Sequence, residues 1–224
     1  MLLSLNNWNG ITSLLIACIE LLLLVNLLIF SEKNKINYIV YAIIILLTCY
    51  QAIEFLICNV GLNSSFAAYL AFTNISFLPP LNFFLVLIIF RNKSKLKYLL
   101  FIPAIFFSIY YFNIVKQFAV VECTVLYATY NYPLGDIFGF FYYSTILFAF
   151  ILLLRKRNEL NKKQFNWLFA AHLLIILPVF AGFILLYLNL PGLVGSMESI
   201  LCKFAFGYAV ALSIFCLNNK TQIK

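Results

Sequence analysis

Five ionisable residues interrupt the apolar segments of this chain, and chemistry is most easily built on them. They are Glu20, Glu54, His172, Glu198 and Lys203. An ionisable side chain in a membrane helix costs at least about 2.5–3.5 kcal/mol on insertion scales, so each one needs a partner or a functional role. We therefore expect any function to depend on this set.

Polar side chains at helical spacing extend the set. Gln51 precedes Glu54 by three residues and Ser199 precedes Lys203 by four, so each pair shares a helix face. Asn74 lies in another apolar segment, next to other polar residues of that segment. Such residues also serve as hydrogen-bonding groups between membrane helices, so both roles stay open. The candidate ligand-binding residues are Glu20, Gln51, Glu54, Asn74, Glu198, Ser199 and Lys203.

The composition indicates that the elements positioning these residues lie in a membrane. Hydrophobic residues make up 65% of the 224 residues and charged residues 10%, whereas soluble domains are about 45–50% apolar and about 25% charged. Each membrane helix uses about 20 residues. We therefore expect one transmembrane domain over residues 1–224, without a separate kinase, nuclease or periplasmic binding domain.

Seven apolar runs are long enough to cross a bilayer. Continuous runs predict helices, because the strands of a membrane β-barrel are segments of about ten residues with alternating hydrophobicity. The predicted fold is all-α, a polytopic bundle of seven transmembrane helices. The predicted spans are 11–30, 37–58, 66–90, 97–115, 137–154, 165–188 and 193–216.

Basic residues predict the orientation. Of the 15 Lys and Arg residues, 13 follow spans one, three, five and seven, and basic connections mark the cytoplasmic side. The amino terminus is then outside and the carboxyl terminus inside. The basic cytoplasmic face explains the net charge of +8, so this charge does not indicate nucleic-acid binding. The same face contacts the lipid bilayer. Richness in Asn, Ile, Lys and Phe suggests a bacterial protein of the inner (plasma) membrane.

Two interpretations of the ionisable residues stay open. In this orientation all except His172 lie in the outer half or near the midplane. In the first interpretation, Lys203 forms a structural ion pair with Glu20 or Glu54 that joins spans one, two and seven. In the second, these residues and Glu198 surround an outward-facing polar pocket for a small ligand, a cation or a proton relay.

Other features bear on the outer side of the bundle. Cys58 and Cys123 both lie there and could form a disulfide in an oxidising compartment; the alternative is two unpaired thiols. The long connection 116–136 either covers the pocket as a lid or lies at headgroup level. Pro79-Pro80 and Pro178 predict kinks, which favour a cavity.

Three short segments resemble a family of prokaryotic seven-helix membrane proteins to which no activity is assigned. Gln51-Ala52-Ile53-Glu54 resembles the family's Gln-x-x-Glu in helix two, and Pro79-Pro80 its proline pair in helix three. The segment 199–205 resembles its Ser-x-x-Cys-x-x-Ala in the last helix. The resemblance implies a seven-helix fold. The pattern of spans is also similar to the sensor modules of bacterial histidine kinases, although no kinase follows here.

A weaker resemblance concerns microbial rhodopsins. Lys203-Phe204-Ala205-Phe206-Gly207 resembles the Lys-x-x-Phe-Gly around their retinal-bearing lysine. The chain departs from that family at Ser199 and Asn74, where rhodopsins have carboxylates, and it lacks the tryptophans that enclose retinal.

The sequence thus predicts a receptor-like or sensory membrane protein with an outward-facing polar pocket. A separate cytoplasmic signalling protein would dock on the basic loop Arg155–Lys163. The alternatives are a small-solute or proton transporter and, less favoured, a retinal-binding protein. No nucleophile and base pair is visible, so we do not expect an enzyme. With one His and no Cys or His pair at ligand spacing, we expect no metal site and no cofactor.

Overall fold

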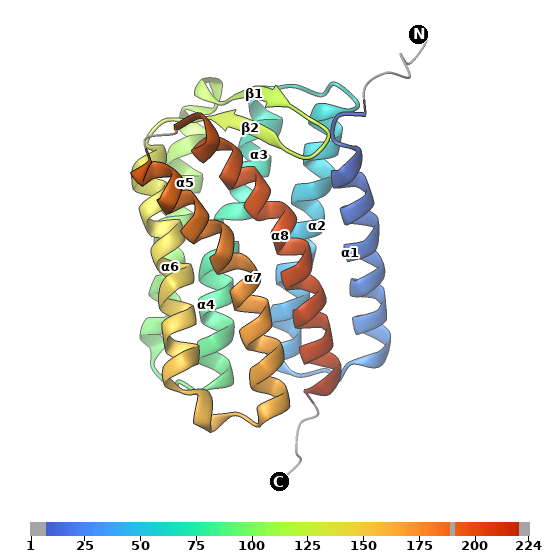
Figure 1. Ribbon diagram of the computed structural model, residues 1–224, viewed down its shortest axis with the longest axis vertical. Coiled ribbons are helices and arrows are strands. Elements are labelled where there is room, and N and C mark those ends of the chain that lie inside the picture. Colours follow the sequence, from blue (N-terminus) through green and yellow to red (C-terminus); the bar gives the residue numbers. More distant parts are fainter. Residues whose placement is uncertain (1–7, 189–190, 220–224) are drawn as a thin grey trace.

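The computed structural model is a helical bundle with a small β-hairpin across one end (Figure 1). It describes residues 8–188 and 191–219, without the side chains of residues 186 and 191–199. The helices and strands are α1 (Ile11–Phe30), α2 (Lys35–Cys58), α3 (Ser65–Ser76), α4 (Leu78–Ile89), α5 (Ile102–Asn113), β1 (Ala119–Cys123), β2 (Ala128–Asn131), α6 (Gly135–Arg155), α7 (Lys162–Tyr187) and α8 (Pro191–Asn218). Short 3₁₀ segments cover Lys95–Phe101, Val115–Gln117 and Arg157–Glu159.

Seven helical segments of the described chain are long and apolar enough to cross a membrane, which confirms the predicted helices. The outer surface of the bundle is apolar as well: on α1, Leu15, Leu22 and Ile29 are each about 62–65% exposed. A large exposed apolar surface is unfavourable in water. These features are those of an integral membrane protein.

The third span is divided into two helices at Phe77. Helix α3 ends at Ser76 and α4 begins at Leu78. Pro79 and Pro80 have no backbone N–H, so they cannot bond to the carbonyl groups one turn earlier, and their rings crowd that turn. The kink predicted in this span is therefore a break, and α4 begins with its prolines in the first turn, where an N–H is not needed.

The long connection 116–136 contains an antiparallel hairpin, an element that the sequence did not predict. Strands β1 and β2 pair Val120 with Tyr130 and Cys123 with Ala128. Its Val, Thr and Tyr residues favour strands, and the Thr124 hydroxyl accepts hydrogen bonds from two backbone N–H groups in the turn. The fold therefore has a β-structured cap on one end of the helices.

An aromatic cluster holds the hairpin against α3, α5 and α6. The Phe72 ring centroid lies 4.3 Å from that of Phe138, 4.7 Å from that of Tyr111 and 4.9 Å from that of Tyr132. The Tyr111 hydroxyl donates to the carbonyl of Pro133 over 2.7 Å. Edge-on and tilted aromatic pairs are favourable packing geometries, so the cap is packed firmly on the bundle.

The hairpin and the basic loops lie at opposite ends of the bundle (Figure 1). The hairpin and the start of α1 are at one end, and the loops after α1, α4 and α6 and the end of α8 are at the other. The predicted orientation requires the basic loops to lie together at one end of the bundle, as they do here. The orientation itself stays a prediction.

Candidate functional site

Lys203 of α8 forms an ion pair with Glu54 of α2, with 2.7 Å between Nζ and Oε1. The ammonium group also donates to Gln51 Oε1 and to Ser13 Oγ, each over 2.8 Å. The Ser13 hydroxyl in turn donates to the same Glu54 oxygen over 2.8 Å. We name Ser13, Gln51, Glu54 and Lys203 the Lys203 cluster. It joins α1, α2 and α8, the first, second and seventh spans.

The Lys203 cluster is closed, not an open pocket. The Glu54 side chain is 1% exposed and that of Lys203 14%, while Ser13 and Gln51 are fully buried. All three ammonium hydrogens have an oxygen partner, and the Gln51 amide donates to the Cys202 carbonyl over 3.0 Å. Of the two interpretations, this geometry corresponds to the structural ion pair, with Glu54 as the partner.

Two carboxyl groups have unused oxygens within the described part of the chain. Glu54 Oε2 and both oxygens of Glu20 are buried without a hydrogen-bond partner. Glu20 lies two turns along α1 from Ser13, and the Thr48 hydroxyl beside it donates to the Ile44 carbonyl. A carboxyl group buried without a partner is costly in an apolar interior, which points to a role for Glu20 beyond packing.

Asn74 is not brought into the Lys203 cluster. Asn74 donates to the Leu70 carbonyl of its own helix, and none of the contacts recorded for the described residues connects it to Lys203. The side chains of Glu198 and Ser199 lie outside the described residues.

A separate polar cluster surrounds His172. Its Nδ1 atom lies 2.8 Å from the Leu168 carbonyl, and its ring meets that of Tyr208 edge-on. The Tyr208 hydroxyl donates to Asn82 over 2.8 Å. This cluster joins α7, α8 and α4 on the side of the bundle away from the hairpin, and His172 is not part of the Lys203 cluster.

Cys58 and Cys123 form a disulfide that ties the hairpin to the end of α2. Gly10 lies beside it with a φ of 73°, and its N–H donates to the Thr124 carbonyl over 2.9 Å. A Cβ atom at Gly10 would lie 3.1 Å from that of Cys58, so glycine permits both the conformation and the close approach. The hairpin is thus held directly above the ends of α1 and α2.

Tyr130 of β2 connects the hairpin to the Lys203 cluster. It packs against Tyr50 and Cys202, and its buried hydroxyl lies close to the side chains of Tyr50 and Glu54. Burial, followed by the nearby negative charge of Glu54, holds the pKa of Tyr130 well above its usual value. The phenol is therefore neutral and available as a hydrogen-bond donor.

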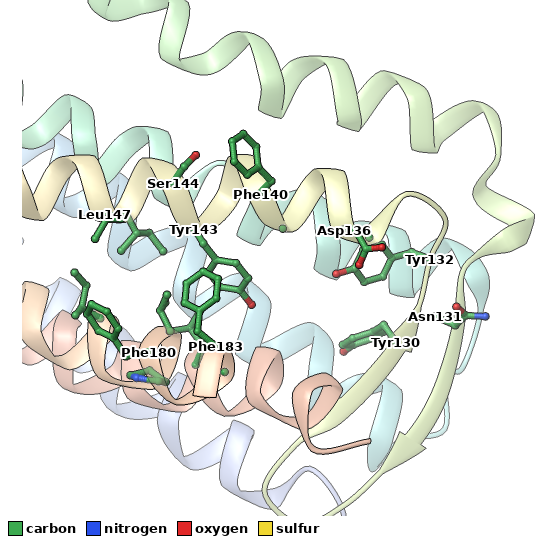
Figure 2. Close-up of a pocket in the computed structure, with 18 residues that line it drawn as sticks. Tyr130, Asn131, Tyr132, Asp136, Phe140, Tyr143, Ser144, Leu147, Phe180 and Phe183 are labelled. Carbon is green, nitrogen blue, oxygen red and sulfur yellow. The ribbon is translucent and has the colours of Figure 1, made fainter. Parts of the chain in front are cut away.

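A cavity of about 690 Å³ lies between α6 and α7 beneath the hairpin. Its volume is within the usual range of about 300–1,000 Å³ for small-molecule sites. Figure 2 shows polar side chains at one end, among them Tyr130, Tyr132 and Asp136, and apolar side chains along the rest, such as Phe140 and Phe183.

The cavity opens toward the surroundings of the bundle. Phe140, Phe180 and Phe183 line it and are each more than half exposed. Small residues provide part of its space: a Cβ atom at Gly182 would meet nothing within 4 Å. Pro178 also lines the cavity, and in Figure 1 the upper part of α7 leans toward α6.

Sequence reasoning missed several of these residues. Ser13 carried a signal, because it shares a face of α1 with Glu20 seven residues later. Tyr130 and Asp136 were noted only as members of the outer loop, and Gly182 was not noted at all. No local pattern indicates a cavity between α6 and α7, because the cavity is a property of their packing.

Comparisons of the chain with models of protein families, with curated proteins and with solved structures found no match. Within the described residues, no group of three or more His, Cys, Asp or Glu side chains could hold a metal ion. Function is therefore inferred from the two features above, the closed Lys203 cluster and the open α6–α7 cavity.

Proposed function

We propose that the protein is a receptor-like membrane protein that binds a small, largely apolar ligand in the α6–α7 cavity. The observation that carries this proposal is the cavity itself, with its volume of about 690 Å³ and its polar end beneath the hairpin. A concave, mostly apolar site with a few convergent polar groups is the usual form of a ligand site. The proposed ligand site adjoins the Lys203 cluster through Tyr130 and Leu201, which line the cavity.

Tyr130 supports a sensory role, because it lies between the ligand site and the Lys203 cluster. It lines the cavity and also packs on Tyr50 and Cys202 beside Glu54. A ligand that displaces Tyr130 would change the surroundings of an ion pair joining three spans. Such a change would be transmitted along α8 to the opposite end, where a cytoplasmic protein would read it at the basic loop Arg155–Lys163.

The ligand site is tested by filling the cavity. Gly182→Trp places a large side chain in open space, and Ile184→Trp adds bulk two residues away on α7, at a residue that is 59% exposed and does not line the cavity. Both variants are reconstituted in phosphatidylcholine nanodiscs with a photoreactive alkyl alcohol. Labelled peptides are then identified by mass spectrometry.

We expect saturable labelling of α6 and α7 peptides in the wild type and in Ile184→Trp, with competition by unlabelled dodecanol. Gly182→Trp should lose this saturable fraction and retain the general labelling of lipid-facing residues. Labelling of α6 and α7 that dodecanol does not compete in the wild type, or that survives in Gly182→Trp, would show that the cavity is not a ligand site.

A proton transporter is the second candidate, and Glu20 is the observation that favours it. A buried carboxyl group without a partner, two turns from an ion pair, is typical of proton-carrying sites in membranes. Proteoliposomes containing a pH-sensitive dye would then show proton flux that Glu20→Gln abolishes. The receptor proposal predicts no flux in either protein.

A further inference from the structure

We infer that the α6–α7 cavity takes a single-chain amphiphile with a cationic amine at its polar end. The inference rests on the proposed function, because it names the class of ligand for that same site. Asp136 is the one charged residue among the described lining residues. It lies in the first turn of α6, and the ion pairs recorded for the described chain do not include it.

The polar end of the cavity suits an ammonium group in three ways. The Asp136 carboxylate supplies a negative charge, and the hydroxyl of Tyr130, which also lines the cavity, has lone pairs that accept a hydrogen bond. The rings of Tyr130 and Tyr132 supply aromatic faces, which attract cations. In Figure 2 these three side chains lie together at the end of the cavity nearest the hairpin.

The absence of basic lining residues argues against an anionic ligand. None of the described residues that line the cavity is Lys or Arg, and the Lys203 ammonium group is already engaged by three oxygens. A carboxylate or phosphate placed beside Asp136 would meet a like charge without a counter-ion. A phospholipid headgroup is disfavoured for the same reason, so we commit to an alkylammonium compound.

The dimensions of the cavity suit an alkyl chain. The lining residues of α6 run from Gly135 to Leu147, which is about 18 Å along the helix axis at about 1.5 Å per residue. Apart from Ser144 and the hydroxyl of Tyr143, the lower part is lined by apolar side chains such as Phe140, Phe180 and Phe183. An extended twelve-carbon chain has a comparable length and would reach the site between α6 and α7 from the surrounding lipid.

The test compares three competitors with the same twelve-carbon chain: dodecylamine, dodecanol and dodecanoate. Each competes with the photoreactive alkyl alcohol at pH 7 in phosphatidylcholine nanodiscs, and its concentration in the nanodiscs is measured by extraction. We expect dodecylamine to compete up to about fivefold better than dodecanol, because Asp136 is exposed, an ion pair between exposed groups contributes about 0.2–1 kcal/mol, and 1.4 kcal/mol is a factor of ten. Dodecanoate should compete least.

Two variants test whether the preference for the amine depends on Asp136. Asp136→Asn should lower competition by dodecylamine to the level of dodecanol, and its circular dichroism spectrum shows whether the variant is folded. Glu122→Gln removes an exposed carboxylate of the hairpin that does not line the cavity, and it should retain the preference.

The outcomes separate the two proposals. Absence of any competed labelling in the wild type would refute the ligand site itself. Competed labelling without a preference for the amine, or with a preference that survives in Asp136→Asn, would overturn the inference about ligand class and leave the ligand site standing.

Discussion

Removing one partner of the Lys203–Glu54 pair should destabilise the protein far more than removing both. In Lys203→Met the ammonium group is lost, and the Glu54 carboxylate keeps neutral donors such as the Ser13 hydroxyl. The carboxylate is 1% exposed, so water cannot replace the lost partner. Breaking a buried pair on one side costs about 3–5 kcal/mol.

The double variant Glu54→Leu/Lys203→Met should recover most of this loss. Replacing a buried ion pair by apolar residues of similar volume is often neutral or stabilising. In the double variant Gln51 and Ser13 each lose one hydrogen bond, and each loss costs about 1 kcal/mol. We therefore expect the double variant to remain within about 2 kcal/mol of the wild type. The coupling energy between the two positions is then at least about 4 kcal/mol, because each single variant loses about 3–5 kcal/mol.

The chain contains a matched control, the exposed pair Lys156–Glu159. Its nitrogen–oxygen distance of 2.8 Å is nearly that of the buried pair, at 2.7 Å, but its side chains are 38% and 52% exposed. Exposed pairs contribute about 0.2–1 kcal/mol. The same cycle at these positions should therefore give a small coupling energy, so that burial alone accounts for the difference.

The cycles are measured by equilibrium unfolding with SDS in mixed micelles, followed by circular dichroism. The expected result is a large coupling energy for the buried pair and a small one for the exposed pair. Additive losses at Lys203 and Glu54, or equal coupling in the two cycles, would show that the ion pair does not hold α2 and α8 together.

Three further predictions concern the hairpin and the orientation. Burial raises the pKa of Tyr130 above its usual value of about 10, so its stabilising contribution is present below pH 10 and is lost as the pH rises further. Between about pH 9 and 11 the melting temperature of the wild type should therefore fall more than that of Tyr130→Phe. Equal decreases of the melting temperature in the two proteins would contradict this. Replacing Cys58 and Cys123 by Ser opens a connection of 65 residues and should cost up to about 4 kcal/mol, the chain-entropy value for that length, so an unchanged melting temperature would be evidence against the tether. With the amino terminus outside, a membrane-impermeant maleimide added to intact cells should label Asn63→Cys and not Lys93→Cys, and the reverse pattern would invert the topology.

The helices themselves were predictable from sequence, because each follows from a local property. Helix α1 begins and ends at the predicted residues 11 and 30, since a run of apolar residues of spanning length needs no tertiary information to be recognised. The proline pair at 79–80 likewise predicted a disturbance in the third span. The hairpin was missed because its strands are short and gain their stability from Phe72, Phe138 and the disulfide, which are distant in sequence.

The candidate site was predictable only in part. Glu54, Gln51 and Lys203 were recognised because polar groups are conspicuous in an apolar sequence. The sequence left Glu20 and Glu54 as equal partners for Lys203. The sequence gives the depth of a residue along its helix but not how the helix is rotated about its axis. Only the packed bundle therefore shows that Lys203 contacts Glu54 and that Glu20 has no such partner.

By itself, then, the sequence determined that this is a membrane protein of seven apolar helices with a few ionisable groups inside, because composition and run length govern transfer into a bilayer. The tertiary structure decided which groups meet and where space remains. The Lys203 cluster and the α6–α7 cavity both depend on how helices far apart in the chain rotate and lean against one another. That arrangement depends on side-chain packing between helices, which no local pattern contains.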